Sequence, residues 1–238
     1  MREELSRLEK LIGTAALEKL ASSRVAVFGV GGVGGHAFEA LVRSGVGEID
    51  IIDGDVVAVS NLNRQIIATA LTVGKPKVDV AEERAKSINP DLIIHKHPIF
   101  YLPDKKEEFG LEFDKYDYIV DAIDTVAAKL DIIKEANARG IPIISAMGCG
   151  NRLDPSKLIV TDIFKTFNDP LAKVMRKQLK ERGIKKLKVV ASTEVPITPK
   201  DVEARTPGST AFVPGAAGLL MASIVVRELI AEREAYQA

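Results

Sequence analysis

The feature that most constrains the fold is a glycine-rich run that follows a short apolar segment near the amino end. The segment Val25–Phe28 is apolar and rich in β-branched residues, which predicts a strand buried on both faces. Gly29, Gly31 and Gly34 then fit the spacing G-x-G-x-x-G. The first allows a tight turn, the second lets the backbone approach a phosphate, and the third lets the next helix pack on its strand. The run therefore predicts a strand, a turn and a helix that together bind a nucleotide phosphate.

A second strand and an acid extend this pattern. The strand expected at 49–52 ends in Asp53, about 20 residues beyond the glycines, which is the usual spacing for an acid that holds ribose hydroxyls. Gly32 adds a fourth glycine to the turn, and the helix expected at 33–44 points its positive dipole end at the anion. Strand, glycines, helix, strand and acid in this order predict a nucleotide site rather than a structural turn.

The segments after this acid differ from those of a simple dinucleotide-binding domain. They supply an arginine, lysines and further acids, in the runs Asp53-Gly-Asp-Val-Val-Ala-Val-Ser-Asn-Leu-Asn-Arg-Gln65, Val73-Gly-Lys-Pro-Lys77 and Val120-Asp-Ala-Ile-Asp124. Arginine offers a planar fork to phosphate and lysine a point charge. These residue types favour chemistry on ATP over hydride transfer.

Together these runs resemble the ATP-binding core of the ubiquitin-activating-type adenylating enzymes. Later segments resemble the branch of that superfamily that contains the tRNA threonylcarbamoyladenosine dehydratases: Ile143-Ile-Ser-Ala-Met-Gly148, Leu158-Ile-Val-Thr-Asp-Ile-Phe164, Asp169-Pro-Leu171 and Ala191-Ser-Thr-Glu194. The resemblance covers nearly the whole chain, from about Arg7 to the last helix. The core motifs are specific to the superfamily, and the later ones separate the branch less sharply.

The resemblance implies roles for the matched polar residues. Asp53 would hold the ribose, and Arg64 and Lys77 the triphosphate of ATP. Asp124 would lie near the Mg²⁺ that accompanies ATP. Arg7 resembles an arginine that reaches the nucleotide of the partner subunit, which implies a homodimer.

Three further residues belong to the same expected site. By resemblance, Asn61 and Gln65 support it, and Asp55 is a turn residue with a minor chance of contact with the nucleotide. The remaining alternatives are simpler roles. Arg64, Lys77 and Arg7 could be ordinary surface charges, Lys75 could replace its neighbour as the phosphate lysine, and Asp124 could cap the helix that follows it.

The single cysteine limits the chemistry. Cys149 alone can form neither an internal disulfide nor a Cys₄ zinc site. It could be a nucleophile if its pKa were lowered, although a packing role is more common, and its position differs from that of the cysteine in thioester-forming relatives. Of the three histidines, His36 follows the glycine turn on the helix. His95 and His97 share one face of a strand, and we expect them to be hydrogen-bonded or exposed rather than to form a metal site.

Positive charge gathers in one later segment of a chain whose net charge is zero. Between residues 165 and 188 there are nine Lys or Arg residues against two acids. Four of them, Lys173, Arg176, Lys177 and Lys180, fall on one face of an expected helix. Such a strip suits RNA phosphates, and a solvated helix face is the alternative. Beyond Phe164 and Phe167, no aromatic platform for stacked bases is obvious.

The pattern of elements predicts one α/β domain spanning 1–238, with a nucleotide-binding half at 1–150 and a half at 151–238 for substrate and dimer contacts. We expect a Rossmann-like, doubly wound, mostly parallel sheet with later antiparallel strands. No signal-peptide pattern occurs at the amino end, and the longest apolar stretch, 216–226, is shorter than a membrane span, so we expect a cytoplasmic protein that binds no membrane. The remaining expected elements are helices at 6–21, 76–87, 126–139 and 216–233, strands at 92–97, 118–122, 141–146, 158–164 and 187–191, and loop at 98–115.

These observations favour an ATP-dependent, cyclising dehydration of threonylcarbamoyladenosine in tRNA, through an acyl-adenylate that releases AMP and pyrophosphate. A carboxylate is already a nucleophile at neutral pH, so the chemistry requires no general base. The alternative is adenylation of the C-terminal glycine of a ubiquitin-like sulfur-carrier protein. The family also suggests a cysteine-desulfurase or sulfur-acceptor system as a partner, and Ser192, Thr193 and Glu194 are polar candidates for contact with the modified base.

Overall fold

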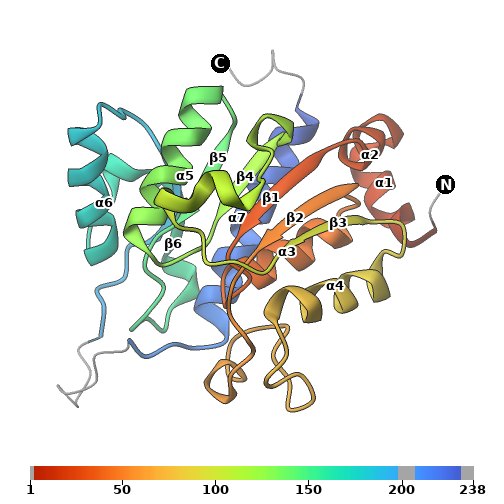
Figure 1. The fold of residues 1–238 in the computed structure, drawn as a ribbon, viewed down its shortest axis with the longest axis horizontal. Coiled ribbons are helices and arrows are strands. Elements are labelled where there is room, and N and C mark those ends of the chain that lie inside the picture. The colour runs from red at the N-terminus through yellow and green to blue at the C-terminus, as the bar shows by residue number, and fades with distance from the viewer. Residues whose placement is uncertain (1–2, 198–206, 232–238) are drawn as a thin grey trace.

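A seven-stranded sheet forms the centre of the computed structural model, which describes residues 3–197 and 207–231 (Figure 1). The strand order is β3-β2-β1-β4-β5-β7-β6, and only β6 runs antiparallel to its neighbour. This confirms the doubly wound, mostly parallel sheet with a later antiparallel strand. The strands are β1 (Arg24–Phe28), β2 (Glu48–Ile52), β3 (Ile93–His97), β4 (Tyr118–Asp121), β5 (Ile143–Ala146), β6 (Leu158–Asp162) and β7 (Lys188–Ser192).

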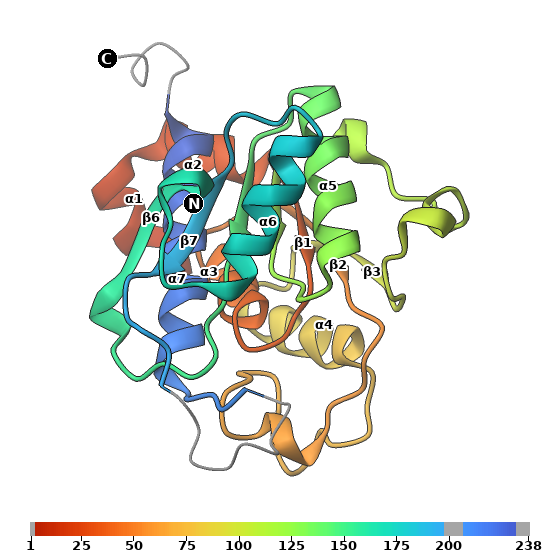
Figure 2. The same ribbon diagram turned by 90° about the vertical axis from the view of Figure 1, so that its left-hand side faces the viewer.

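Helices cover both faces of the sheet (Figure 2). One face packs on α3, α4 and α7, and the other on α5 and α6. The α-helices are α1 (Ser6–Ile12), α2 (Thr14–Ala21), α3 (Gly34–Arg43), α4 (Lys77–Ile88), α5 (Val126–Arg139), α6 (Pro170–Glu181) and α7 (Phe212–Ile230). Short 3₁₀ turns are η1 (Glu3–Leu5), η2 (Val59–Asn61), η3 (Pro103–Phe109), η4 (Phe113–Lys115), η5 (Pro155–Lys157) and η6 (Ile163–Lys165).

The register of the central strands brings the ends of three of them together. Phe28 of β1 pairs with Ile52 of β2 on one side and with Asp121 of β4 on the other. The residues that follow each strand therefore meet at one edge, the carboxyl edge of the parallel sheet. Ligands of open α/β sheets bind at this edge, where the strand order reverses.

Three element boundaries differ from the sequence prediction for local reasons. The first helix divides at Gly13, whose φ of +83° ends α1 and starts α2. The last helix begins at Phe212, four residues before the predicted start, and it can include Pro214 because a missing N–H is tolerated in the first turn. The predicted loop at 98–115 contains the turns η3 and η4.

Helix α7 is the one helix among residues 3–197 and 207–231 that is long and apolar enough to cross a membrane. Half of its apolar window is buried within the protein. Its buried residues, such as Met221 and Val225, belong to the same hydrophobic cluster as Phe38 of α3 and Val27 of β1. The helix thus forms one wall of the core.

Candidate nucleotide-binding site

The turn between β1 and α3 requires glycine at two positions. Gly29 has a φ of +86°, and a β-carbon there would lie 2.9 Å from the backbone oxygen of Ala122. A β-carbon at Gly34 would lie 1.8 Å from the backbone oxygen of Gly29. No side chain caps the amino end of α3, so its first N–H groups and its dipole can serve an anion.

The other two glycines of the turn lie under the segment that carries Arg64 and Gln65. A β-carbon at Gly31 would have Gln65 Nε2 as its nearest neighbour, at 3.7 Å, and one at Gly32 would lie 3.4 Å from Arg64 Cγ. The oxygen Oε1 of Gln65 is buried and has no hydrogen-bond partner among the described residues. An unpaired buried acceptor beside a glycine turn is consistent with a ligand that brings a donor.

Local hydrogen bonds shape this covering segment. Asn61 Oδ1 accepts the backbone N–H of Ala58 at 3.0 Å, which closes the turn η2. Arg64 Nη1 donates to the backbone oxygen of Ser60 at 2.7 Å and to Asn63 Oδ1 at 3.0 Å. Asn61 therefore supports the segment, as expected, while the guanidinium of Arg64 stays half-buried beside the glycine turn.

Asp53 connects the end of β2 to the glycine turn. Its Oδ2 accepts the N–H of Val30 at 2.8 Å, and its Oδ1 accepts the N–H of Asp55 at 2.9 Å. The side chain is only 9% exposed. Burial raises the pKa of Asp53 above its ordinary value, even though the nearby Lys77 ammonium acts in the opposite direction. A carboxylate held this way still has lone pairs for ribose hydroxyls.

Lys77, at the start of α4, points at the two acids that follow β2. Its Nζ lies 2.8 Å from Asp55 Oδ2 and 4.0 Å from Asp53 Oδ2, and its side chain is 6% exposed. Lys75 instead lies 3.9 Å from Glu83 and is half exposed. The structure therefore brings Lys77, and not Lys75, next to the expected ribose acid.

Asp124 follows β4 at the same edge and is exposed. Its Oδ1 accepts from the Thr125 hydroxyl at 3.4 Å, and Thr125 rather than Asp124 occupies the cap position of α5. Among the described residues no group of three or more His, Cys, Asp or Glu side chains could hold a metal ion. One carboxylate fits Mg²⁺ that arrives with a nucleotide, because phosphates and water then complete its shell.

Sequence patterns missed a buried polar cluster beneath this edge. Lys129 Nζ lies 2.9 Å from Asp121 Oδ2 and 3.1 Å from Ser145 Oγ, and the three residues are completely buried. Lys129 is in the first turn of α5, Asp121 ends β4 and Ser145 is in β5. The ion pair brackets the segment that carries Asp124. Only a lysine in an otherwise core-facing position of α5 could have signalled it.

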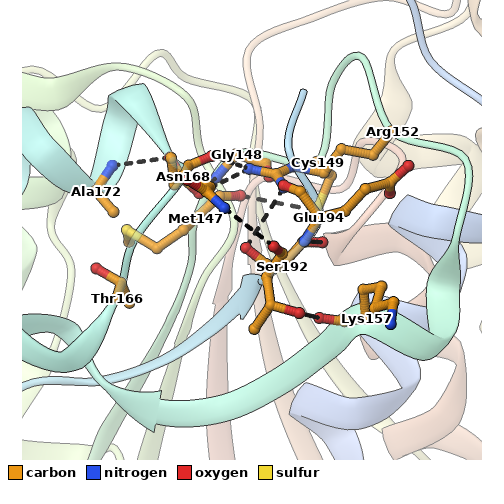
Figure 3. Close-up of polar contacts among 12 residues, drawn as sticks. Met147, Gly148, Cys149, Arg152, Lys157, Thr166, Asn168, Ala172, Ser192 and Glu194 are labelled. Carbon is orange, nitrogen blue, oxygen red and sulfur yellow. Dashed lines mark hydrogen bonds and ion pairs between the residues drawn. The ribbon is translucent and has the colours of Figure 1, made fainter. Parts of the chain in front are cut away.

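A second cluster follows β5 and β7 (Figure 3). The buried guanidinium of Arg152 donates to four backbone oxygens, those of Gly148, Asn168, Ser192 and Glu194. The three polar candidates in this region also have structural partners. Ser192 Oγ accepts from the N–H of Glu194, Thr193 Oγ1 donates to the Lys157 oxygen, and the Glu194 carboxylate accepts from the N–H groups of Leu153 and Asp154.

Cys149 lies between these clusters and its thiol is not activated. Burial raises its pKa to about 12. Its Sγ donates to the backbone oxygen of Met147 at 3.7 Å. A thiol with this pKa stays protonated at neutral pH and is a poor nucleophile, which agrees with the expected packing role.

The four basic residues expected on one face divide in the structure. Lys173, Lys177 and Lys180 are exposed on α6. Arg176 is half-buried and donates to the backbone oxygen of Thr166 at 3.0 Å and to its hydroxyl. Three of the four side chains therefore remain available to a polyanion, and the fourth holds a loop.

The histidines have structural contacts, as expected. His95 Nε2 lies 2.7 Å from Glu48, and His97 Nε2 lies 2.9 Å from Asp50. His36 packs against α7, where a β-carbon at Gly215 would lie 3.3 Å from its ring. The ring thus faces the first turn of α7, whose Pro214 lies beside Gly32 of the glycine turn.

Arg7 is exposed on α1, far from the glycine turn of its own chain. Leu5, just before α1, packs against Gly45, where an added β-carbon would lie 2.8 Å from its Cδ1. Gly45 shortly precedes β2, so α1 lies near the amino end of that strand (Figure 1). Asp53 follows the opposite end of β2. Arg7 is therefore at the end of β2 opposite the expected nucleotide site of its own chain, and its expected role at the partner subunit's nucleotide stays a prediction.

Known proteins are similar to this chain in sequence and in fold. The sequence model of the ThiF family matches residues 5–238. A tRNA threonylcarbamoyladenosine dehydratase of Bacillus subtilis is 44% identical over 98% of this chain and 97% of its own length. Crystal structures of the Escherichia coli tRNA N6-threonylcarbamoyladenosine dehydratase with ATP and with AMP are 34% identical, cover 96% of this chain and 94% of theirs, and have TM-scores of 0.88 and 0.87. The motif resemblance is thereby confirmed, and the chain belongs to the ThiF family.

Proposed function

We propose that the protein is an ATP-dependent tRNA threonylcarbamoyladenosine dehydratase. It closes the threonyl part of that modified nucleoside into a ring and releases AMP and pyrophosphate. One observation carries the proposal. The glycine turn, Asp53, Arg64 and Lys77 meet at one sheet edge, in a chain that matches such a dehydratase over 97% of the relative's length.

The first step joins the substrate carboxylate to the nucleotide. A carboxylate oxygen attacks the α-phosphorus of ATP, and the bond from that phosphorus to pyrophosphate breaks. Negative charge spreads over the phosphoryl oxygens, and catalysis consists of positioning and charge stabilisation. The amino end of α3, the Arg64 guanidinium and the Lys77 ammonium would supply that stabilisation, while Asp53 holds the ribose.

The second step closes the ring. A nucleophile within the carbamoyl group attacks the activated carbonyl carbon, and the carbon–oxygen bond to AMP breaks. The attacking group releases its proton as the ring closes, and one oxygen of the original carboxylate leaves with AMP, so the nucleoside loses the elements of water. The acceptor lies in the same substrate, and no enzyme thioester is needed. The half-buried Cys149, whose raised pKa keeps it protonated, is consistent with that route.

The proposed enzyme would also bind Mg²⁺, a second copy of the chain and tRNA. Mg²⁺ neutralises phosphate charge when it is bound with ATP, and Asp124 would hold it. A homodimer would let Arg7 reach the partner subunit's nucleotide. The exposed Lys173, Lys177 and Lys180 would contact tRNA phosphates. A cytoplasmic location stays a prediction from the sequence, and a sulfur-transfer partner stays a prediction from the family.

The test is a mass measurement on nucleosides. We would incubate the protein with Mg-ATP and tRNA that carries threonylcarbamoyladenosine, digest the tRNA and weigh the products. We expect the modified nucleoside to lose one water in an ATP-dependent reaction, and Arg64→Ala to slow the reaction about 10²- to 10³-fold. Lys77→Ala should also slow it strongly, whereas its exposed neighbour, in Lys75→Ala, serves as the matched control and should change little.

Two other outcomes would contradict the proposal. An unchanged nucleoside mass, with pyrophosphate released only after addition of a ubiquitin-like carrier, would support the sulfur-carrier alternative. Full activity of Arg64→Ala, with unchanged ATP binding, would refute the site assignment itself.

A further inference from the structure

The loop between β6 and α6 presents an aromatic ring to solvent. Phe167 is 53% exposed, while Thr166 and Asp169 on either side are buried. Exposure alone does not distinguish this ring, because Phe100 at 62% and Phe212 at 50% are similarly exposed. What distinguishes Phe167 is that the residues on both sides of it are held by hydrogen bonds.

The residue before Phe167 is held from α6. Arg176 donates to both the backbone oxygen and the hydroxyl of Thr166. The same hydroxyl donates to the backbone oxygen of Ile163 at 2.6 Å. These bonds fix the loop on the side of η6.

The residues after it are held from the sheet (Figure 3). The backbone oxygen of Asn168 accepts from Arg152 at 2.9 Å, and its side-chain amide donates to the Thr193 oxygen at 3.3 Å. Asp169 accepts the N–H of Gly148 at 2.9 Å and also caps α6. Asn168 has a φ of +54°, in the left-handed region that few residues other than glycine adopt.

These anchors also locate the ring. Gly148 follows β5 and Thr193 follows β7, so Asn168 lies at the same carboxyl edge as the glycine turn. Helix α6 begins next to it and carries the exposed row Lys173, Lys177 and Lys180. A fixed aromatic face beside a row of cations is the combination that binds single-stranded nucleic acid, where bases stack on rings and phosphates follow the charges.

We propose that Phe167 is a stacking platform for one unpaired base of the RNA substrate. The proposal rests on the proposed function and specifies how its substrate is held. Arg152 and Arg176 then act as positioning residues that hold the ring outward. The three lysines bind the backbone of the same strand.

The test compares Phe167→Leu, which keeps an apolar side chain, with Phe167→Tyr, which keeps an aromatic face. We would measure binding of tRNA carrying threonylcarbamoyladenosine over a range of salt concentrations, together with the KM for that tRNA and the Kd for ATP. Phe167→Leu should bind tRNA about tenfold more weakly, and Phe167→Tyr should bind like the wild type. The slope of log K against log salt should stay unchanged in both, whereas Lys177→Ala should reduce it by about one.

Each other outcome overturns the proposal. Wild-type affinity of Phe167→Leu means that the ring contacts no base. Equally weak tRNA binding by the Leu and Tyr variants means that the aromatic face is not used for stacking. A parallel change in the Kd for ATP means that the substitution disturbs the nucleotide site. The proposed function is tested separately, by the dehydration assay on the wild-type protein. A wild type without dehydration activity refutes the proposed function, whereas an active wild type with unaffected Phe167 variants refutes only this inference.

Discussion

Two carboxylates, one within strand β2 and one directly after it, have opposite surroundings. Asp50 lies in the middle of the strand, where Arg24 donates two hydrogen bonds to it and Tyr116 a third, and His97 lies 2.9 Å away. Asp53 lies just past the strand's end, where only backbone N–H groups bond to it and Lys77 approaches to 4.0 Å. Asp50 therefore has several side-chain hydrogen-bond partners, whereas Asp53 is held in place by backbone N–H groups.

The pKa values follow this difference. Burial pushes the pKa of Asp50 upward, but hydrogen bonds from His97 and Arg24 outweigh it and the pKa falls below its ordinary value. At Asp53 burial dominates and the pKa rises. An acid with all of its partners in the chain stabilises the fold. Asp53, which accepts no hydrogen bond from a side chain and lies at the edge where ligands bind, is available to a ligand.

Removal of the structural acid should have the largest effect. In Asp50→Ala the buried Arg24 guanidinium and His97 lose their counter-charge, and we expect the free energy of unfolding to fall by about 3–5 kcal/mol. Urea unfolding measures this, and Asp79→Ala, which removes an exposed acid paired with Lys96, should cost about 1 kcal/mol or less. The Kd for ATP should stay unchanged in both. Weaker ATP binding by a folded Asp50→Ala protein would contradict the division between the two acids.

The complementary substitution should affect binding instead. Asp53→Asn keeps the size of the side chain but removes the charge that would accept ribose hydroxyls. Charge-assisted hydrogen bonds contribute about 1.5–3 kcal/mol, so we expect the Kd for ATP to rise about 10- to 100-fold in calorimetric titration. The free energy of unfolding should change by about 1 kcal/mol or less. A large loss of stability with unchanged ATP affinity would assign Asp53 the structural role.

Acid titration should separate the two acids by sign. The depressed pKa of Asp50 gives stability that is present above the ordinary value of 3.8 and is lost as pH falls through the lower folded pKa. The raised pKa of Asp53 gives stability that is full below 3.8 and is lost as pH rises through the higher folded pKa. Both contributions follow from linkage, because a carboxyl group that binds its proton differently in the folded and unfolded states makes the free energy of unfolding depend on pH.

The free energy of unfolding is measured from about pH 3 to about pH 7. The proteins compared are the wild type, Asp50→Asn and Asp53→Asn. The advantage of wild type over Asp50→Asn should shrink toward acid. The advantage over Asp53→Asn should grow toward acid. Parallel curves for the two variants would show that their environments do not differ as the structure indicates.

The sequence predicted the carboxyl-edge region better than the interior because its signals are local. Gly29, Gly34 and Asp53 are recognised from spacing within one strand–turn–helix–strand unit, and the turn and its neighbouring acid lie where that spacing places them. Asp50 and His97 meet only through strand pairing, so no local pattern indicated their contact.

Long-range packing explains the remaining surprises. The buried pair of Lys129 and Asp121 depends on how α5 lies against β4. Helical spacing placed Arg176 on a basic face, but the spacing could not show that the loop at Thr166 would return to meet it. Contacts of this kind depend on the assembled tertiary structure, which periodicity does not encode.

Cys149 shows whether a pKa raised by burial is enough to identify a functional group. Of the substitutions considered, we expect Cys149→Ala to have the smallest effect. Its pKa of about 12 is raised by burial, as at Asp53, but its thiol contacts a backbone oxygen and packs on the core. Cys149→Ala should leave dehydration within about twofold and cost about 1 kcal/mol of stability. Because the chain has one cysteine, alkylation reports on this thiol alone and should be slow in the folded protein and fast in urea. Rapid alkylation of the folded protein, or loss of turnover in Cys149→Ala, would contradict the packing role and indicate that Cys149 takes part in catalysis.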